Sequence, residues 1–498
     1  MRKHEKLAER IFSSKLKDLS DQLMSLQQEK KLLQDENVRL SREMAASRGA
    51  AKHSFLFVDQ RHVIRDPIYG IVPLSQEAFE TLDLPQMQRL KHIRQNGLLF
   101  HVYPGAVHTR FEHSVGVYHL ARQALAHFIC LDGVELDETL ARAFLAAALL
   151  HDIGHFPFSH ALEEIRVAEQ RVFDHVVRAT YMLENDSELR GAITRIWGSN
   201  IIDYVIAILD GARNIQLPSW MQRLIASSVD LDKMDYLKRD SYHIGVPYGH
   251  IETQRLIAAL RTANQGFTVE EKDIGNVEQL ILAKFLMYRN VYWHHTVRIV
   301  TAMFRRAIWD FLEDLGLLDE GGLVNSDRLR QLASCTEEML YPTMCEIARD
   351  KRIPDSTREL FERLENRRLH KRAHVFYCTE EPGKTLEGIY RNASARKRKE
   401  EELAARFANE ARNVGIPPVL IDVCEPESLV PDVQVHFPDP PPGQEPVLAW
   451  DHRRYISVFD RAELDTMHNS IRKVRYFYAP DPEFENLKDA IRENVEHL

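Results

Sequence analysis

The chain has few cysteines, and none of them forms a CxxC pair. Cys130, Cys335, Cys345, Cys378 and Cys424 are the five cysteines among 498 residues. An odd, scattered set excludes a disulfide framework or a zinc knuckle and is typical of reduced thiols in a cytosolic protein. No apolar run approaches the roughly 20 residues that cross a bilayer, and no signal peptide opens the chain. We therefore expect a cytoplasmic protein with no membrane partner.

An excess of basic charge is also lacking. Lys and Arg number 65 against 74 Asp and Glu, a formal net charge of -9, so a nucleic-acid partner is unsupported. A composition with 44% hydrophobic and 28% charged residues excludes a wholly disordered or fibrous chain. Histidine, in contrast, is abundant: there are 23, many of them between positions 92 and 175. The chemistry of the protein is expected in that region.

The first 46 residues carry a heptad pattern. Phe12, Leu19, Leu26, Leu33 and Leu40 recur every seven residues, with no Pro or Gly among them. This regular spacing predicts a self-associating coiled coil in preference to a single amphipathic helix on the globular body. We expect a homo-oligomer with an even number of subunits: a dimer, a tetramer or a larger assembly.

The body that follows is expected to be mainly α. Apolar residues recur at three- and four-residue spacing in Leu140–Leu150, Ile202–Leu209 and Gln279–Leu312, whereas strand-like alternation is scarce. The segment Ile64–Pro73, with a Pro and a Gly inside it, predicts a turn or a short hairpin.

The residue pattern changes from helical to strand-like near the C-terminus. Val419–Cys424, Val433–Phe437 and Tyr455–Phe459 read as strands between Pro-rich segments. We predict three parts: a coiled-coil helix at 1–46, a helical core with a helical extension at 53–392, and a small α+β C-terminal module at 393–498.

A cluster of histidines and aspartates predicts a metal site. An apolar helix ends in His151 and Asp152, and burying either one unpaired would be costly. With His113 and Asp232 from two other helical stretches, the chain offers two imidazoles and two carboxylates. Such a set suits a divalent ion such as Mn, Fe, Mg, Ni or Zn. A zinc-protease site through His151 and His155 lacks the Glu that this motif requires after its first His.

These residues lie in three blocks, HTRFEHS, LLHDIGHFPFSH and DLDKMDYLKRD, in that order. The blocks resemble the HD-superfamily deoxynucleoside triphosphate triphosphohydrolases, above all the branch that contains the mammalian protein with a SAM and an HD domain, together with bacterial relatives. The resemblance runs from about Arg65 to Arg298. It implies an HD-domain helical core, a deoxynucleoside triphosphate (dNTP) substrate, and deoxynucleoside and triphosphate as products.

The resemblance also implies roles for individual residues. The metal ligands would be His113, His151, Asp152 and Asp232. The catalytic residues would be His155, its acidic partner Glu163, and His175. The substrate-binding residues would be Gln95, His160, Lys233, Tyr236, Asp240 and Tyr292. Arg110 joins them because its charge would offset the negative charge of a triphosphate.

A regulatory nucleotide site is a further implication. Relatives are activated by a nucleotide bound where subunits meet, and Asp83, Gln88, Arg89 and Lys91 match residues of that pocket. Without the family context, this spacing is that of an ordinary helical surface.

Three functions stay open at this point. The first is a metal-dependent dNTP triphosphohydrolase. The second is another HD phosphohydrolase, either a 5′-nucleotidase or a phosphodiesterase of cyclic or oligonucleotides, which would share the four ligands. The third is a non-catalytic nucleotide sensor or scaffold. By analogy, dNTP depletion would serve control of the nucleotide pool or antiviral defence.

Overall fold

The computed structural model describes residues 61–494 except for positions 131, 168–169, 212, 214, 264–265, 319–334, 349–354, 380, 382, 391, 408–415, 424–433, 437–446, 449–458, 460 and 485. The predicted coiled coil at residues 1–46 and most of the predicted strand Tyr455–Phe459 lie outside the described residues. Helices predominate in the described chain, so the prediction of a mainly α protein is confirmed.

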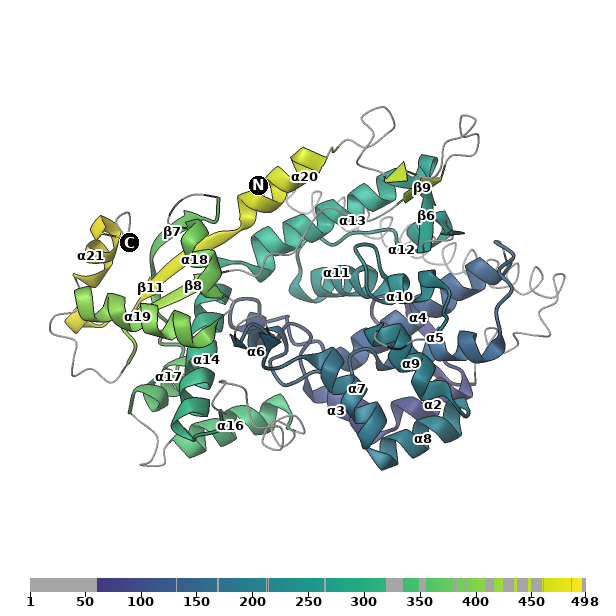
Figure 1. Cartoon of the computed structure of the whole chain (residues 1–498), viewed down its shortest axis with the longest axis horizontal. Coiled ribbons are helices and arrows are strands. Elements are labelled where there is room, and N and C mark those ends of the chain that lie inside the picture. Colours follow the sequence, from purple (N-terminus) through teal and green to yellow (C-terminus); the bar gives the residue numbers. More distant parts are fainter. Residues whose placement is uncertain are drawn as a thin grey trace, which may run out of the picture.

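Four helices form the centre of the larger body. They are α4 (Arg110–Cys130), α5 (Glu138–Leu150), α9 (Ile201–Asp210) and α11 (Leu231–Ile244). Helix α5 packs between α4 and α9, and α11 packs against α4 (Figure 1). Every residue of α5 from Ala143 to Leu150 is buried, which explains why the segment is apolar on all sides. Asp137 caps the N-terminus of α5 by accepting a hydrogen bond from the Thr139 N–H.

The other helices surround this centre or continue the chain toward the C-terminus. They are α2 (Gln76–Leu82), α3 (Pro85–Arg89), α6 (His160–Glu163), α7 (His175–Asn185), α8 (Ser187–Trp197), α10 (Ser219–Ile225), α12 (Thr253–Ala259), α13 (Ile274–Met287), α14 (His295–Asp314), α16 (Glu337–Ala348), α17 (Asp355–Glu365), α18 (Gly383–Tyr390), α19 (Ala393–Phe407), α20 (Arg461–Ile471) and α21 (Leu487–Asn494), with short 3-10 turns η2 (Leu90–His92), η3 (Gly97–His101), η4 (Glu271–Asp273) and η7 (Pro482–Phe484).

The helical stretch predicted at Gln279–Leu312 is broken into two helices. Helix α13 passes into a π-helical turn, η5 (Tyr288–Tyr292), and α14 begins at His295. The His294 side chain caps α14 by accepting a hydrogen bond from the Thr296 N–H at 3.3 Å. The apolar period runs through both helices and does not reveal the break. The break matters because π-helical turns often lie at functional sites.

The strands form small sheets. Strands β1 (Val63–Asp66) and β2 (Gly70–Pro73) pair antiparallel, as the prediction of a short hairpin required. Strands β3 (Arg166–Val167) and β4 (Gln170–Arg171) form a second hairpin. The sequence analysis missed the β5 (Leu260–Ala263) and β6 (Gly266–Glu270) hairpin, which β9 (Gln434–His436) and β10 (Val447–Leu448) extend to the order β10-β9-β6-β5.

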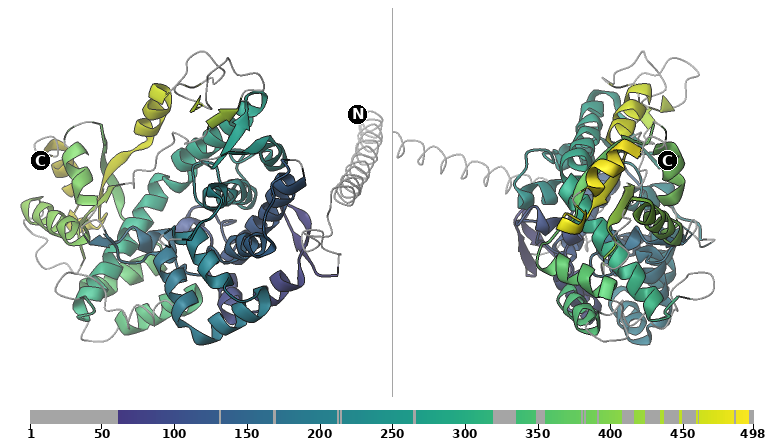
Figure 2. Two further views of the ribbon diagram at one scale, coloured as in Figure 1. Left: turned by 45° about the vertical axis from the view of Figure 1, so that its right-hand side comes forward. Right: turned by 90° about the vertical axis from the view of Figure 1, so that its left-hand side faces the viewer.

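A three-stranded antiparallel sheet lies toward the C-terminus. Its order is β7 (Lys371–Tyr377), β11 (Lys473–Tyr478) and β8 (Val419–Val423), with β11 in the centre. Helix α14 contacts both β7 and β8, and the sheet lies at one end of the molecule beside this helix (Figures 1 and 2). Leu420 and Phe477 of the sheet belong to the same buried cluster as the apolar residues of α14. The sheet is therefore packed into the body of the protein.

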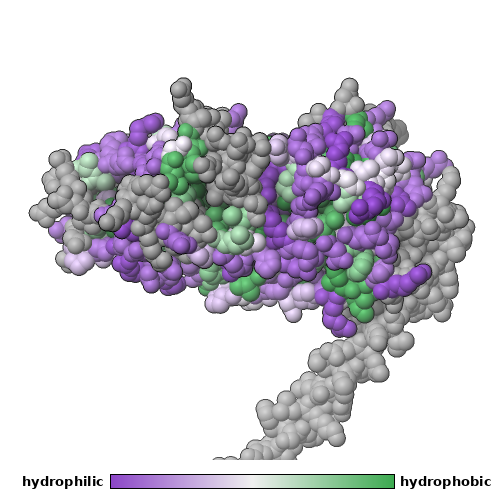
Figure 3. All heavy atoms as spheres, turned by 90° about the horizontal axis from the view of Figure 1, so that it is seen from below, coloured by the Kyte–Doolittle hydropathy of each residue, from purple (hydrophilic) through white to green (hydrophobic). Residues whose placement is uncertain are grey.

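The described surface seen from below is mostly hydrophilic, with apolar side chains in separate patches (Figure 3). Among the described residues, no single helix has the length and apolar character of a membrane span. Helices α8 and α9 meet those criteria only as a pair, bent by 106°.

Candidate active site

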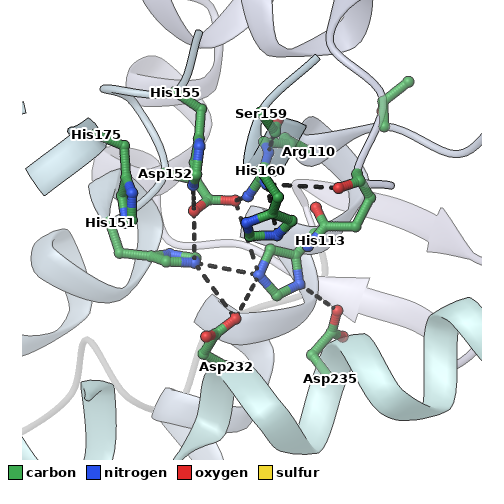
Figure 4. A network of polar contacts seen from close by, with 12 residues as sticks. Arg110, His113, His151, Asp152, His155, Ser159, His160, His175, Asp232 and Asp235 are labelled. Atoms are coloured by element: carbon green, nitrogen blue, oxygen red, sulfur yellow. Dashed lines mark hydrogen bonds and ion pairs between the residues drawn. The ribbon is translucent and has the colours of Figure 1, made fainter. Parts of the chain in front are cut away.

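Four side chains from three segments converge at the centre of the larger body. His113 lies on α4, His151 and Asp152 follow the end of α5, and Asp232 lies in the first turn of α11 (Figure 4). His113 Nε2 lies 2.9 Å from Asp232 Oδ1 and 3.2 Å from His151 Nε2. His151 Nε2 lies 3.4 Å from Asp152 Oδ1 and 4.0 Å from Asp232 Oδ1. The predicted ligand set is thus brought together around one point.

The ring nitrogens of the two histidines are oriented toward that point. The His113 Nδ1–H donates to Asp235 Oδ2 at 2.7 Å, and the His151 Nδ1–H donates to the Ala148 carbonyl at 2.9 Å. These bonds leave the two Nε2 atoms facing each other beside two carboxylate oxygens. Two lone pairs and two carboxylates favour a cation between them, and this donor set fits a divalent metal ion.

The pKa values of His113 and Asp232 also indicate that the site needs a positive charge. Burial lowers the pKa of His113, but hydrogen bonds to Asp232 and Asp235 raise it to about 10. Burial raises the pKa of Asp232, yet His113 and His151 bring it well below its usual range. The site therefore holds a proton or a metal cation, since its two carboxylates stay ionised.

Asp235 is a residue of the candidate site that the sequence analysis did not single out. It is fully buried and orients His113, while Arg239 Nε and Nη2 donate to its two oxygens at 2.8 and 2.9 Å. Arg239 also donates to Asp66 at 2.8 Å. A signal was present in the sequence: Asp235 lies three residues after Asp232 and four before Arg239, so all three share one helical face.

Arg110 ties two parts of the site together. Its Nη1 donates to Asp152 Oδ2 at 2.7 Å and its Nε donates to Ser159 Oγ at 2.8 Å. Burial raises the pKa of Asp152, but Arg110, His151 and His155 bring it well below its usual range. The predicted phosphate-binding arginine thus also orients a predicted metal ligand.

Glu163 lies within a cluster of three histidines. Its carboxylate lies 2.5 Å from His175 Nδ1, 3.2 Å from His160 Nδ1 and 3.5 Å from His155 Nδ1. It is 4% exposed, which excludes the solvent-facing position common for Glu on helices. The rings of His155 and His175 stack at 3.9 Å, and His155 Nε2 lies 3.1 Å from Asp152 Oδ1. The predicted catalytic residues are therefore adjacent to the predicted metal ligands.

The pKa values of His175 and His155 are shifted in opposite directions. Burial lowers the pKa of His175, but Glu163 raises it above its ordinary value. Burial, Arg110 and His175 lower the pKa of His155 well below its ordinary value. Phe158 and Ser159, between His155 and His160, have φ of 59° and 36°. These are strained conformations for non-glycine residues, and such strain tends to occur at functional sites.

A cavity of about 540 Å³ opens onto these groups. A volume of this size suits a small-molecule ligand. All seven predicted substrate-binding residues line it, as do Tyr288 and Trp293 from the break between α13 and α14. Tyr288, Tyr292 and Trp293 thus form an aromatic wall of the cavity at the point where the predicted continuous helix is interrupted.

Asp240 is held at the cavity by two neighbours. His108 Nε2 lies 2.7 Å from Asp240 Oδ1, and the Tyr292 hydroxyl donates to Asp240 Oδ2 at 2.5 Å. His108 is 2% exposed, and the sequence analysis gave it no role although it begins the HTRFEHS block. Lys233 Nζ donates to Asp230 at 2.9 Å, which holds the ammonium group beside the cavity.

The predicted regulatory residues lie on and around α3, and none of the four lines this cavity. Lys91 Nζ donates to Gln88 Oε1 at 2.8 Å, while Asp83 is the C-cap of α2. Arg89 points inward, and its Nη2 donates to the carbonyl of His155 at 2.9 Å. Arg89 thus contacts the active-site loop directly, and a role for these residues in nucleotide binding stays a prediction.

Comparisons with known proteins agree with this geometry. Residues 110–240 match the HD domain model, and residues 251–436 match the model of the HD-associated region. An uncharacterized protein of Methanocaldococcus jannaschii is 36% identical over 53% of this chain and 53% of its own length. The human deoxynucleoside triphosphate triphosphohydrolase SAMHD1 is 27% identical over 64% of this chain and 55% of its own length. The chain thus spans about half the length of the curated relatives that it matches.

A solved structure shows the same fold. The crystal structure of a phosphohydrolase from Bacteroides thetaiotaomicron has a TM-score of 0.64 and 23% identity, covering 84% of this chain and 100% of that one. The HD-domain match contains all four converging donors and the Glu163 cluster, and the HD-associated match begins shortly after α11. The chain therefore contains an HD domain at residues 110–240, followed by an HD-associated region at residues 251–436.

Proposed function

We propose that the protein is a metal-dependent triphosphohydrolase that cleaves a dNTP between the α-phosphorus and the 5′ oxygen, releasing a deoxynucleoside and inorganic triphosphate. The observation that carries the proposal is a single cavity lined by three members of the donor set (His151, Asp152 and Asp232), by the Glu163 cluster and by an aromatic wall. The named activity of relatives such as the human protein supports the same substrate class.

The residues around the donor set would act on the phosphates. A divalent cation held by His113, His151, Asp152 and Asp232 would polarise the phosphoryl group and lower the pKa of an attacking water. Arg110 and Lys233 would offset the negative charge of the triphosphate chain. Water oxygen bonds to the α-phosphorus as the bond from phosphorus to the 5′ oxygen breaks.

The Glu163 cluster would supply the proton that the departing 5′ oxygen needs. Glu163 contacts His175 Nδ1 at 2.5 Å and raises the pKa of His175, and His175 stacks on His155, whose pKa is well below its ordinary value. A general acid must be protonated near neutral pH and within reach of the leaving group. We propose that His175 acts together with His155 in this role, and that Glu163 orients both.

The opposite side of the cavity would bind the deoxynucleoside. Asp240 and Tyr292 form a fixed hydrogen-bonding pair, and Tyr236 lies 6.5 Å from Tyr292 between ring centroids. Gln95 is buried at the cavity, and among the described residues its Oε1 has no hydrogen-bond partner. A carboxylate, an amide and two phenols suit a sugar hydroxyl and a base.

Product analysis tests this function. Metal-loaded protein is incubated with each dNTP and NTP, and the products are separated by chromatography. Triphosphate with a free deoxynucleoside is expected; monophosphate or single phosphate would indicate a 5′-nucleotidase or a phosphodiesterase instead. Asp152→Ala should abolish turnover, whereas Asp203→Ala, which removes an exposed carboxylate paired with Arg213, should retain it. Equal function of wild type and Asp152→Ala would support a non-catalytic sensor.

Assembly and regulation are part of the same proposal. We propose a homo-oligomer with an even number of subunits and a cytoplasmic location, with Asp83, Gln88, Arg89 and Lys91 contributing to an activating nucleotide site. Light scattering with and without each nucleotide tests both points. An unchanged mass together with unchanged turnover across all nucleotides would contradict the regulatory site. We further propose a division into a coiled-coil segment, an HD core and a C-terminal module.

A further inference from the structure

Five charged side chains form a buried cluster between the cavity and the C-terminal sheet. They are Glu164 at the end of α6, Arg298 and Arg305 on α14, Asp422 on β8 and Arg475 on β11, and none is more than 9% exposed. Residues so polar are rarely buried unless they are paired. We refer to these five residues as the wall cluster.

Asp422 is the centre of the wall cluster. It accepts hydrogen bonds from Arg298 Nε at 3.0 Å and Nη2 at 2.6 Å, from Arg305 Nη2 at 2.9 Å and from Arg475 Nη1 at 3.3 Å. Glu164 accepts two further bonds from Arg298, at 2.7 and 2.8 Å, and one from Arg305. Burial alone would raise the pKa of Asp422, but Arg298, Arg305 and Arg475 hold it well below its usual range. Two ionised carboxylates thus face three guanidinium groups, which leaves one net positive charge in the wall cluster.

The wall cluster contacts the cavity at two places. Arg298 and Glu164 line the cavity themselves, and Glu164 directly follows Glu163 in the chain. Arg475 Nη2 donates to the carbonyl of Trp293 at 3.2 Å, and Trp293 lies in the aromatic wall. Arg475 therefore holds the Trp293 backbone at the cavity, and Asp422 is linked through Arg298 and Arg305 to the Glu164 side chain, beside the catalytic cluster.

Stability alone is a weak reason for such an arrangement. Replacing a buried ion network by apolar residues of similar volume is often neutral or stabilising. Positioning of active-site groups is a better reason, because displacing such a group by about 1 Å can lower the catalytic rate ~100-fold. The Trp293 N–H donates to the Tyr288 carbonyl at 2.9 Å at the end of η5, and the Trp293 carbonyl accepts from Arg475 before α14 begins.

We propose that Asp422 and Arg475 are positioning residues of the active site, through which the C-terminal sheet holds Trp293 and the Glu163–Glu164 segment at the cavity. The two residues touch neither the donor set nor the Glu163 carboxylate in any contact described. The expected changes in kcat and KM rest on the proposed function, whereas the expected changes in hydrogen–deuterium exchange do not.

Glu400 on α19 provides a matched control. It is 3% exposed, accepts from Arg306 Nη1 on α14 at 2.7 Å, and accepts from the Ile421 N–H of β8 at 2.8 Å. It therefore joins the same helix to the same strand, but neither Glu400 nor Arg306 lines the cavity. Asp422→Asn and Glu400→Gln each remove one buried charge from this contact.

The experiment compares the wild type, Asp422→Asn, Arg475→Gln and Glu400→Gln as full-length, metal-loaded protein. Hydrogen–deuterium exchange is followed in peptides that cover residues 160–166 and 288–298, and kcat and KM are measured with dNTPs. Asp422→Asn should speed exchange in both peptides and raise KM about tenfold, the scale of one charge-assisted hydrogen bond, with a smaller fall in kcat. Arg475→Gln should speed exchange only around Trp293. Glu400→Gln should lower the thermal midpoint without either effect.

Equal behaviour of Asp422→Asn and Glu400→Gln in exchange and in the split between KM and kcat would overturn the proposal. If Asp422→Asn does not fold, Arg475→Gln decides: faster exchange around Trp293 supports the proposal, and unchanged exchange rejects it. If the wild type releases no triphosphate from any dNTP, the proposed function fails, and the exchange comparison still tests the positioning role.

Discussion

Asp235→Asn tests how the donor set is oriented. Asp235 accepts the His113 Nδ1–H at 2.7 Å, so that His113 Nε2 is left to face the other donors. An asparagine can present its N–H₂ group to Nδ1 instead, which would place the ring proton on Nε2, where a metal would bind. We expect metal affinity to fall about 10- to 100-fold, the usual effect of losing such a partner of a ligating histidine.

A stability change accompanies this loss of affinity. Asp235 also pairs with Arg239, which is 0% exposed, and removing one partner of a buried ion pair costs about 3–5 kcal/mol. Asp66→Asn is the control, because Asp66 accepts from Arg239 at 2.8 Å without contacting His113. It should lower stability but leave metal affinity near that of the wild type.

The assay is competition with a metal-binding dye at fixed pH, combined with urea unfolding of the metal-free proteins. Unchanged metal affinity in Asp235→Asn, or an equal loss of affinity in Asp66→Asn, would refute the reasoning. The first result would mean that the tautomer of His113 does not matter; the second would mean that general loosening of α11 explains the effect.

Four further predictions follow from the described contacts. Gly116→Ala should lower both the thermal midpoint and metal content, because a Cβ on Gly116 would overlap the Asp235 carboxylate and the Arg239 guanidinium; normal values of both would contradict the close approach of α4 and α11. His108→Phe should raise the KM for dNTPs about tenfold, because Asp240 loses a buried hydrogen bond. Steady-state assays measure kcat and KM, and a metal content equal to that of the wild type is the control. Burial raises the pKa of Glu337 from 4.5 to about 7, so the folded state binds the proton more tightly than the unfolded state. The free energy of unfolding of the wild type, measured with urea, should therefore fall by about 3 kcal/mol as pH rises from 4.5 to 7, whereas that of Glu337→Gln should lack this fall. Equal pH dependence of the two proteins would contradict the raised pKa of Glu337. Removal of the metal by a chelator should lower the thermal midpoint of the wild type, since a ligand at 100 times its Kd adds about 2.7 kcal/mol to stability, and Asp152→Ala should show no chelator-dependent shift.

The convergence of the four predicted metal ligands was predictable because short blocks of sequence carry them. His151 and Asp152 end an apolar helix in which every residue from Ala143 is buried, so their burial follows from the local pattern. Asp232 lies in the first turn of a helix with a clear N-cap, Asp230. The local sequence pattern does not predict how the two imidazole rings are oriented. His113 is held by Asp235, which lies 122 residues away in the chain, and His151 is held by the nearby carbonyl of Ala148.

The aromatic wall was less predictable, since it depends on the end of a helix. The apolar period runs through Gln279–Leu312, yet η5 and the His294 cap interrupt it and place Tyr288, Tyr292 and Trp293 at the cavity. Nothing in the sequence between Met287 and His295 is a Pro or a Gly. The usual breaker signals are therefore missing, and tertiary packing decides where the helix stops.

The contribution of the C-terminal sheet illustrates what a single charged residue in a strand can indicate. Strand β8 reads VLIDV and is buried throughout, so Asp422 is the one ionisable side chain in a five-residue apolar strand. A buried carboxylate requires a cation nearby, and that requirement could have been read from the sequence. The identity of the cations could not, because Arg298 and Arg305 lie 124 and 117 residues away. Their seven-residue spacing places them two turns apart on one face of α14, and this face is shared between the sheet and the cavity. The same geometry that buries the strand therefore connects it to the active site.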